Sequence, residues 1–325
     1  MTTVNNNAFN TTSYDMYQVD AFASKVFEGN PAAVIPMKGN TWFTDEKMQQ
    51  IATENNLSET AFLISKDTTN NNNSDNDNTD NNTCEYDIRW FTPNGEVDLC
   101  GHATLGSAYV VFKFLKPPTM NKIQFNTQKN GALYVTKQQQ LQMLTEENSS
   151  NKKNANIIGL LTMDFPADTP TKLITPDEIL NKESVTNALN GTEVLDIFIG
   201  RDDLLIIVKD EDAIMNLKPN FSLIASILNT KYRGMNVTSA SSSSSTYDCY
   251  SRSFFPTLGV NEDPVCGSAH CLISVYWSNI TNKLELKARQ ASKRGGDVYI
   301  KLNKDKSRIS LSGTCAMYMK ATVYL

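Results

Sequence analysis

The spacing of hydrophobic and polar residues changes along the chain, and these changes predict both strands and helices. Alternation over residues 17–21 predicts a strand. The residues Gly29, Asn30 and Pro31 then predict a turn, after which residues 32–35 predict a second strand. Strands that begin a chain in this way are compatible with several mixed folds, so the later segments decide the class.

A helical spacing follows. Thr44 precedes two acidic residues, which is typical of a helix N-terminus, and Met48, Ile51 and Ala52 share one face. We expect this helix to end near Asn56. Residues 58–65 then predict another strand.

Two segments far apart in the chain predict the same supersecondary unit. The first has a strand from residue 88, a turn at 93–95 and an apolar helix over 103–114. The second has a strand over 252–256 and an apolar helix that runs to Trp277. Helices this rich in small and apolar residues are typical of a buried position.

The two segments also match residue by residue. Residues 89–93 resemble 252–256, and residues 98–103 resemble 263–269. In each, an acidic residue and a Cys-Gly pair precede the helix: Asp98, Cys100 and Gly101 in the first, and Asp263, Cys266 and Gly267 in the second. An internal repeat of a whole unit predicts two halves related by a pseudo-twofold axis.

Three polar, low-complexity tracts interrupt this pattern, at residues 68–83, 138–156 and 239–245. The first is almost pure Asn, Asp, Ser and Thr, so we expect a disordered loop between two strands. The other two tracts predict surface loops.

Composition limits the class of protein. A chain of 325 residues with 40% hydrophobic residues predicts two domains with real cores. The net charge of −5, without a basic stripe, argues against nucleic acid, and no apolar run is long enough for a membrane span. The N-terminus shows no secretory signal, and the six cysteines form no C-x-x-C pair. We therefore expect a cytoplasmic protein with no structural metal.

The two Cys-Gly helix starts are candidates for anion binding. The first N–H groups of a helix lack internal partners, and the helix dipole adds positive charge there. Gly101 and Gly267 would let a ligand approach the backbone. Two such starts facing each other would hold a carboxylate and stabilise the negative charge that develops when a neighbouring C–H is deprotonated. Two ordinary helix caps beside tight turns are the alternative.

Glu59 is the second candidate. It precedes an apolar strand, where partial burial would raise its pKa towards that of a useful general base. An exposed glutamate at a strand end is the simpler interpretation of this residue alone.

Five segments together resemble the PhzF-like phenazine-biosynthesis isomerase family: residues 18–22, 29–34, 56–62, 100–108 and 262–270. The resemblance implies an α+β, diaminopimelate-epimerase-like fold, in which two similar domains each wrap a mixed sheet around a central helix. The active site then lies between the domains. We expect one domain over 1–127, completed by a last strand at 317–325, and a second over 128–316.

The resemblance also implies site residues for a cofactor-independent isomerase that moves a proton on a small carboxylic acid. Glu59 is the proton shuttle, and His102 and Asp263 share protons or position the substrate. The expected substrate-binding residues are Ser58, Gly101, Gly267 and Ser268. His270, one turn into its helix, is expected to be structural, and a homodimer is one expected assembly.

Cys100 and Cys266 leave two other interpretations open. They stand where related epimerases and racemases carry paired thiols, one acting as base and the other as acid. Thiols at helix starts have lowered pKa values, which would suit a two-thiol amino-acid racemase or epimerase. A catalytically silent binding or scaffold protein is the remaining alternative.

Overall fold

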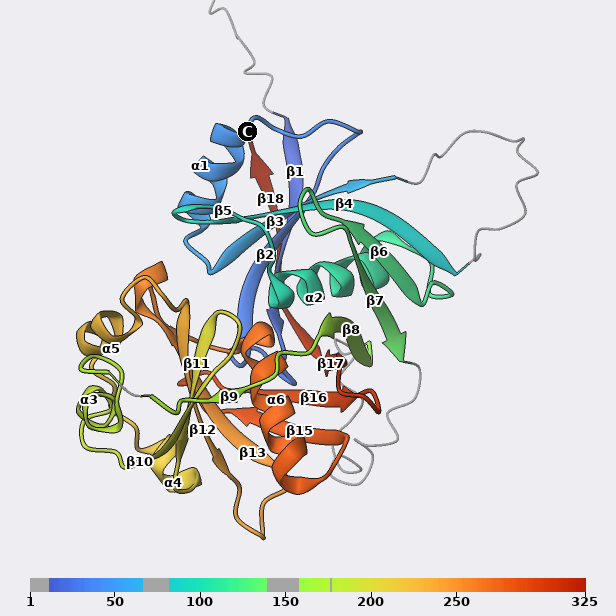
Figure 1. Ribbon diagram of the computed structural model, residues 1–325. Coiled ribbons are helices and arrows are strands. Elements are labelled where there is room, and N and C mark those ends of the chain that lie inside the picture. The colour runs from blue at the N-terminus through green and yellow to red at the C-terminus, as the bar shows by residue number, and fades with distance from the viewer. Residues whose placement is uncertain (1–11, 67–81, 139–157, 176) are drawn as a thin grey trace, which may run out of the picture.

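The computed structural model describes residues 12–66, 82–138, 158–175 and 177–325 (Figure 1). Hydrogen bonds join its 18 strands into one continuous sheet. The sheet curls around two long buried helices, one in each half of the molecule, as Figure 1 shows.

The strands of the first half of the sheet pair in an order that recurs in the second half. Its strands are β1 (Ser13–Ala21), β2 (Asn30–Pro36), β3 (Glu59–Ser65), β4 (Thr83–Thr92), β5 (Gly95–Val97), β6 (Lys122–Asn126), β7 (Ala132–Gln138) and β8 (Leu160–Pro166). The pairs β1–β2, β3–β4, β6–β7 and β7–β8 are antiparallel, whereas β2–β3 and β4–β6 are parallel. The short strand β5 forms a hairpin with β4.

Eight strands of the second half, β10 to β17, repeat this order, and β9 and β18 are additional. Its strands are β9 (Thr171–Lys172), β10 (Val194–Ile199), β11 (Asp203–Val208), β12 (Gly234–Ala240), β13 (Cys249–Phe255), β14 (Val260–Asp263), β15 (Glu285–Gln290), β16 (Gly296–Leu302), β17 (Arg308–Gly313) and β18 (Cys315–Tyr324). The parallel pairs are β11–β12 and β13–β15, and β14 forms the hairpin with β13. The predicted internal repeat is therefore confirmed.

Two contacts complete the arrangement. β8 pairs with β17, the equivalent strand of the other half, so the sheet runs across the molecule without a break. β18 pairs along the whole of β1, which places the last strand beside the first. The division into domains at residues 127 and 128 stays a prediction, and the repeated strands continue past it to Pro166.

The central helices are α2 (Gly101–Val110), which continues as a π-helical turn to Leu115, and α6 (Gly267–Thr281). Nearly every residue of α2 is buried, which its small and apolar side chains permit. The other helices are α1 (Asp45–Asn55), α3 (Lys182–Ala188), α4 (Glu211–Met215) and α5 (Phe221–Leu228), and they pack against the outer faces of the strands.

The same ion pair braces the strand–hairpin unit in each half. Arg89 on β4 binds Glu96 through two contacts of 2.7 Å. Arg252 on β13 binds Glu262 in the same way, at 2.7 and 2.9 Å. Two-pronged pairing of this kind fixes geometry as well as charge, so the arginines are equivalent reference points in the two halves.

Most of the predicted elements are confirmed. Thr44 caps α1 by accepting a hydrogen bond from the Lys47 amide at 3.3 Å. Met48, Ile51 and Ala52 lie on the buried face of α1, as expected. The helix ends before Asn56, whose φ of 47° is left-handed.

Several boundaries differ from the expectation. The first central helix begins at Gly101, not residue 103, because the Cys-Gly step itself opens the helix. Gln138 ends β7, Thr83 begins β4, and Ser239 is a buried residue of β12, since backbone pairing there overrides polar composition. Residues 68–81 and 139–156 of these tracts lie outside the described residues. Within the described ranges, no helix is both long and apolar enough to cross a membrane.

Candidate active site

Asn30 connects the two halves at the centre of the molecule. It is the first residue of β2 and is fully buried, so the predicted turn position is wrong: the strand begins two residues earlier, at Asn30. Its amide nitrogen lies 3.1 Å from His102 Nδ1 and donates to Asp263 Oδ1 at 2.5 Å and to the Val265 carbonyl at 3.2 Å. Ser58 Oγ donates to Asn30 Oδ1 at 3.2 Å. Asn30 thus contacts three of the expected site residues.

Glu59 and His102 form a close pair beside this amide. Glu59 Oε2 and His102 Nε2 lie 2.8 Å apart, and their side chains are 16% and 8% exposed. The contact has the distance of an ion pair but not the alignment of a hydrogen bond, and neither atom has another hydrogen-bond partner in the described part of the chain. Buried polar atoms normally find partners, so this pair is available to a ligand.

The pKa of His102 is raised in this setting. Burial alone would lower its pKa, but the neighbouring Cys100 sulfur and the Glu59 carboxylate raise the pKa well above its ordinary value. A protonated imidazole next to a carboxylate is suited to proton transfer.

Cys100 and Cys266 are the N-cap residues of α2 and α6, and neither side chain caps its helix. The Cys100 sulfur lies 3.5 Å from His102 Nδ1, and the Cys266 sulfur lies 3.3 Å from Ser268 Oγ. Burial raises the pKa of both thiols, and the charge of Glu59 raises that of Cys100 further. Burial therefore opposes the lowered thiol pKa expected at these helix starts.

The turn before α6 is held from β15. Gln290 accepts a hydrogen bond from the Cys266 amide at 2.8 Å and donates to the Asp263 carbonyl at 2.7 Å. Ser292 Oγ donates to the Pro264 carbonyl at 2.7 Å. These contacts fix the direction in which the Asp263 carboxyl points, towards Asn30.

Arg294 clamps the segment before Asn30 from the second half. It donates to Asp20 Oδ1 at 2.7 Å and to the carbonyls of Gly29 at 2.8 Å and Glu28 at 2.9 Å. Gly29 has a φ of 63°, and a Cβ there would lie 2.1 Å from the Ala21 carbonyl oxygen, so only glycine fits. The position of Asn30 therefore depends on both halves.

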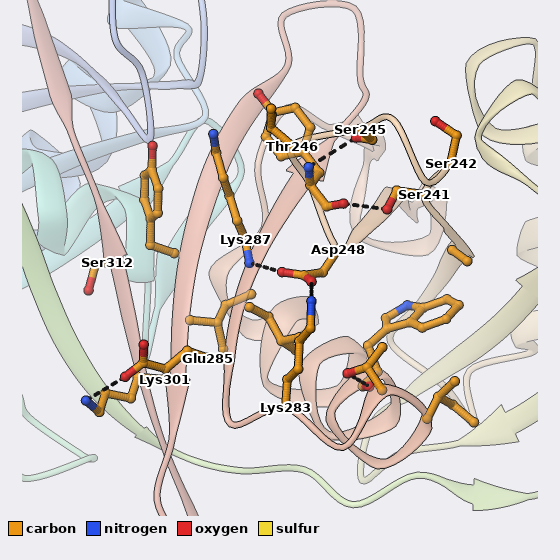
Figure 2. A pocket seen from close by; sticks show the side chains of 18 of the residues that line it. Ser241, Ser242, Ser245, Thr246, Asp248, Lys283, Glu285, Lys287, Lys301 and Ser312 are labelled. Carbon is orange, nitrogen blue, oxygen red and sulfur yellow. Dashed lines mark hydrogen bonds and ion pairs between the residues drawn. The ribbon is translucent and has the colours of Figure 1, made fainter. Parts of the chain in front are cut away.

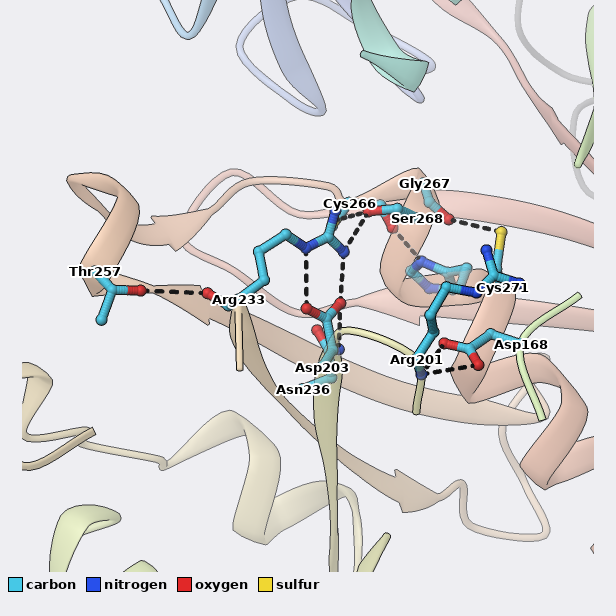
Figure 3. Close-up of polar contacts among 11 residues, drawn as sticks. Asp168, Arg201, Asp203, Arg233, Asn236, Thr257, Cys266, Gly267, Ser268 and Cys271 are labelled. Atoms are coloured by element: carbon cyan, nitrogen blue, oxygen red, sulfur yellow. Dashed lines mark hydrogen bonds and ion pairs between the residues drawn. The ribbon is translucent and has the colours of Figure 1, made fainter. Parts of the chain in front are cut away.

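The expected site residues separate into two groups. Glu59, His102, Asp263 and Ser58 meet around Asn30, with Gly101 at the adjoining start of α2. Gly267 and Ser268 lie at the start of α6, where Figure 3 shows Arg233 bound to Asp203 and reaching Ser268. His270 is buried, with Nδ1 2.7 Å from the Cys266 carbonyl, and burial lowers its pKa to about 4, consistent with a structural role.

Glu59, Cys100 and His102 form the one set of side chains, among those described, whose donor atoms could share a metal ion; these atoms lie within 4.8 Å of one another. Metal binding needs a thiolate and a neutral imidazole. The raised pKa values of Cys100 and His102 mean that a metal would have to displace a proton from each of them.

A cavity of about 930 Å³ lies elsewhere, between residues 241–248, the end of α6 and strands β15 and β16 (Figure 2). Asp248 accepts hydrogen bonds from Lys283 Nζ at 2.6 Å and from the Lys287 amide at 2.8 Å. Lys301 binds Glu285 at 2.7 Å. Because these charged groups already pair with one another, the cavity is a weaker candidate for the active site than the Glu59–His102 pair.

Asp263 gives the site a measurable pH dependence. Burial raises its pKa, as does the charge of Glu59, while His102 opposes the shift. When folding raises the pKa of a carboxyl group, the protein becomes less stable as the pH rises from the pKa of the unfolded state through the pKa of the folded state. Asp263→Asn should therefore raise the free energy of unfolding at neutral pH by on the order of 1 kcal/mol and leave it unchanged in acid. Urea unfolding at both pH values, with the half-exposed Asp164→Asn as control, measures this; equal stability at neutral pH would contradict it.

Comparisons with known proteins agree with this geometry. The family model described as phenazine biosynthesis-like protein, PhzC-PhzF, matches residues 19–321. The chain is 38% identical over 310 residues to an uncharacterized isomerase of Pseudomonas aeruginosa, covering 95% of this chain and 98% of that one. It is 35% identical to a PhzF family protein of Enterococcus faecalis of known structure, with a TM-score of 0.75 over 97% of this chain and 100% of that one. A predicted epimerase of Pseudomonas aeruginosa, 17% identical, shares the fold with a TM-score of 0.63 over 95% of this chain and 99% of that one. The expected α+β, epimerase-like fold is confirmed.

Proposed function

The chain belongs to the PhzC-PhzF family of phenazine biosynthesis-like proteins and is an isomerase, and from this premise we propose that it moves a proton between two carbon atoms of a small carboxylic acid. The observation that carries the proposal is the Glu59–His102 pair, whose facing atoms are 2.8 Å apart, buried, and without other hydrogen-bond partners among the described residues. Ionisable groups with a perturbed pKa, such as His102, gather at active sites.

Glu59 acts as both base and acid. Its carboxylate takes a proton from one carbon: the C–H bond breaks, its electron pair enters the conjugated system of the substrate, and an O–H bond forms on Glu59. The same O–H then returns the proton to a different carbon. This proton transfer needs no oxidant, reductant or cofactor.

The neighbouring groups stabilise the charge that forms between these steps. The His102 ring lies next to the reacting carboxyl, at the start of α2, whose first N–H groups have no side-chain cap. Asp263 is held by a hydrogen bond from Asn30, and its raised pKa favours the protonated form that could share a proton with the substrate. Ser58 orients Asn30 rather than the substrate directly.

We further propose that the protein works in the cytoplasm on a free small molecule, without nucleic acid or a membrane as partner. A homodimer remains a prediction.

A panel of unsaturated and hydroxylated cyclic carboxylic acids, incubated with the protein in D₂O and followed by proton NMR, tests the reaction. We expect at least one acid to give a product in which a hydrogen has moved to a different carbon, with part of the original hydrogen retained. Exchange at a single carbon of an amino acid, with inversion and full deuterium incorporation, would contradict the glutamate mechanism and favour the two-thiol racemase.

A further inference from the structure

The repeat allows the two halves of the site to be compared position by position. Phe62 pairs with Arg89 across β3 and β4, and Val237 pairs with Arg252 across β12 and β13. Because the two arginines are equivalent, Glu59, three residues before Phe62, corresponds to Gly234. Ser58 corresponds to Arg233 by the same count.

Position 234 cannot carry a second base. A Cβ on Gly234 would lie 2.2 Å from Phe255 Cε1 and 2.3 Å from Phe255 Cδ1. The ring of Phe255, which is buried, therefore fills the space that the Glu59 side chain uses in the first half. At this pair of equivalent positions only the first half supplies a carboxylate, and the second half offers the arginine one residue before.

Arg233 is fixed in direction at the start of α6 (Figure 3). Its Nε and Nη2 donate to Asp203 at 2.9 and 2.6 Å, and Nη2 also donates to Ser268 Oγ at 3.0 Å. The guanidinium packs over the Phe255 ring at 5.4 Å, and 38% of the side chain remains exposed. Across the described chain its Nη1 group makes no hydrogen bond, so two N–H donors stay available.

A short series of contacts connects this arginine to the reacting pair. Ser268 Oγ lies 3.3 Å from the Cys266 sulfur, whose turn carries Asp263. Asp263 contacts Asn30 at 2.5 Å, and Asn30 contacts His102 at 3.1 Å. Contacts through Ser268, Cys266, Asp263, Asn30 and His102 therefore connect Arg233 to Glu59.

We propose that Arg233, together with Ser268 Oγ and the first N–H groups of α6, binds the carboxylate of the substrate. Asp203 compensates the charge of Arg233 and fixes the orientation of its guanidinium group. Hydrogen bonds from Nη1 and the dipole of α6 would therefore hold the anion. This inference rests on the proposed function and assigns its two tasks: the first half moves the proton, and the second half holds the acid group. The favoured substrate class is a compact acid with its carboxylate and reacting C–H on opposite ends.

Binding of benzoate and of its neutral analogue benzamide, measured by calorimetry on the full chain, tests the proposal without turnover. The unaltered protein should bind benzoate at least ten times more tightly than benzamide. Arg233→Met should lose that preference, while Arg233→Lys, which keeps the charge without the fork, should keep part of it. Glu59→Gln should retain the full preference.

Removing Arg233 leaves the Asp203 carboxylate, 5% exposed, without its ion pair, so the single variant could unfold. The double variant Arg233→Met with Asp203→Asn avoids this and should show the same loss of preference. An unaltered protein that binds both compounds equally, or either methionine variant with the preference intact, would overturn the proposal. Failure of Glu59→Gln to impair turnover would instead overturn the proton-shuttle assignment, so the two failures are distinguishable.

Discussion

Glu59→Gln should lower turnover by on the order of 10² to 10⁴, the usual contribution of a positioned general acid–base. Glutamine keeps the shape of the side chain at the start of β3 but cannot take or return a proton. Steady-state kinetics on an acid identified in D₂O measures the change. Substrate binding should be little affected, because we propose that Arg233 rather than Glu59 binds the carboxylate of the substrate.

The cysteines provide the matched controls. Cys100→Ser and Cys266→Ser should change turnover only slightly, since backbone N–H groups rather than sulfurs face the substrate. Under a thiol mechanism the two serine variants would lose turnover and Glu59→Gln would keep it, because a hydroxyl is a far weaker acid than a thiol. Two nearly inactive serine variants beside an active Glu59→Gln would identify the protein as a two-thiol enzyme.

Arg294→Met should lower the free energy of unfolding by about 3 kcal/mol, the cost of leaving one partner of a buried ion pair alone. Asp20 is 3% exposed, and burial already raises its pKa, so it depends on this guanidinium. Two carbonyls of the segment before Asn30 lose their donor as well. Urea unfolding at neutral pH measures the loss.

Arg308→Met is the control, because its pair with Asp164 is about half exposed on both sides. Exposed pairs contribute less than about 1 kcal/mol. Equal losses for the two arginines would show that the clamp has no special role. A selective loss at Arg294, with turnover reduced in the protein that remains folded, would show that the clamp positions Asn30.

The sequence was most informative where the spacing is periodic or repeated. The helix at Thr44 follows from its cap and buried face, and the two Cys-Gly helix starts follow from their repetition. Backbone pairing across the sheet could not be obtained in this way, because register depends on strands far apart in the chain. The equivalence of Ser58 and Arg233 is visible only once those registers are known.

Asn30 shows why part of the site was missed. Gly29, Asn30 and Pro31 have the composition of a turn, and the left-handed Gly29 does end one. The next residue, however, begins a buried strand, and an asparagine there needs polar contacts from distant segments. Gln290 and Arg294 were missed for a related reason: each acts through backbone groups of residues far away in sequence, which leave no local signal.

During synthesis, β1 leaves the ribosome long before β18 exists, although the two strands pair along their entire length. Until then one edge of β1 has no hydrogen-bond partner and is open to wrong pairing with other chains. Asn30 begins β2, which pairs with β1, and its contact with Asp263 and the clamp of Arg294 on Gly29 come from the second half. A nascent chain therefore carries Glu59 and His102 before the residues that hold Asn30 exist, and the sheet closes only when the final strand pairs with β1.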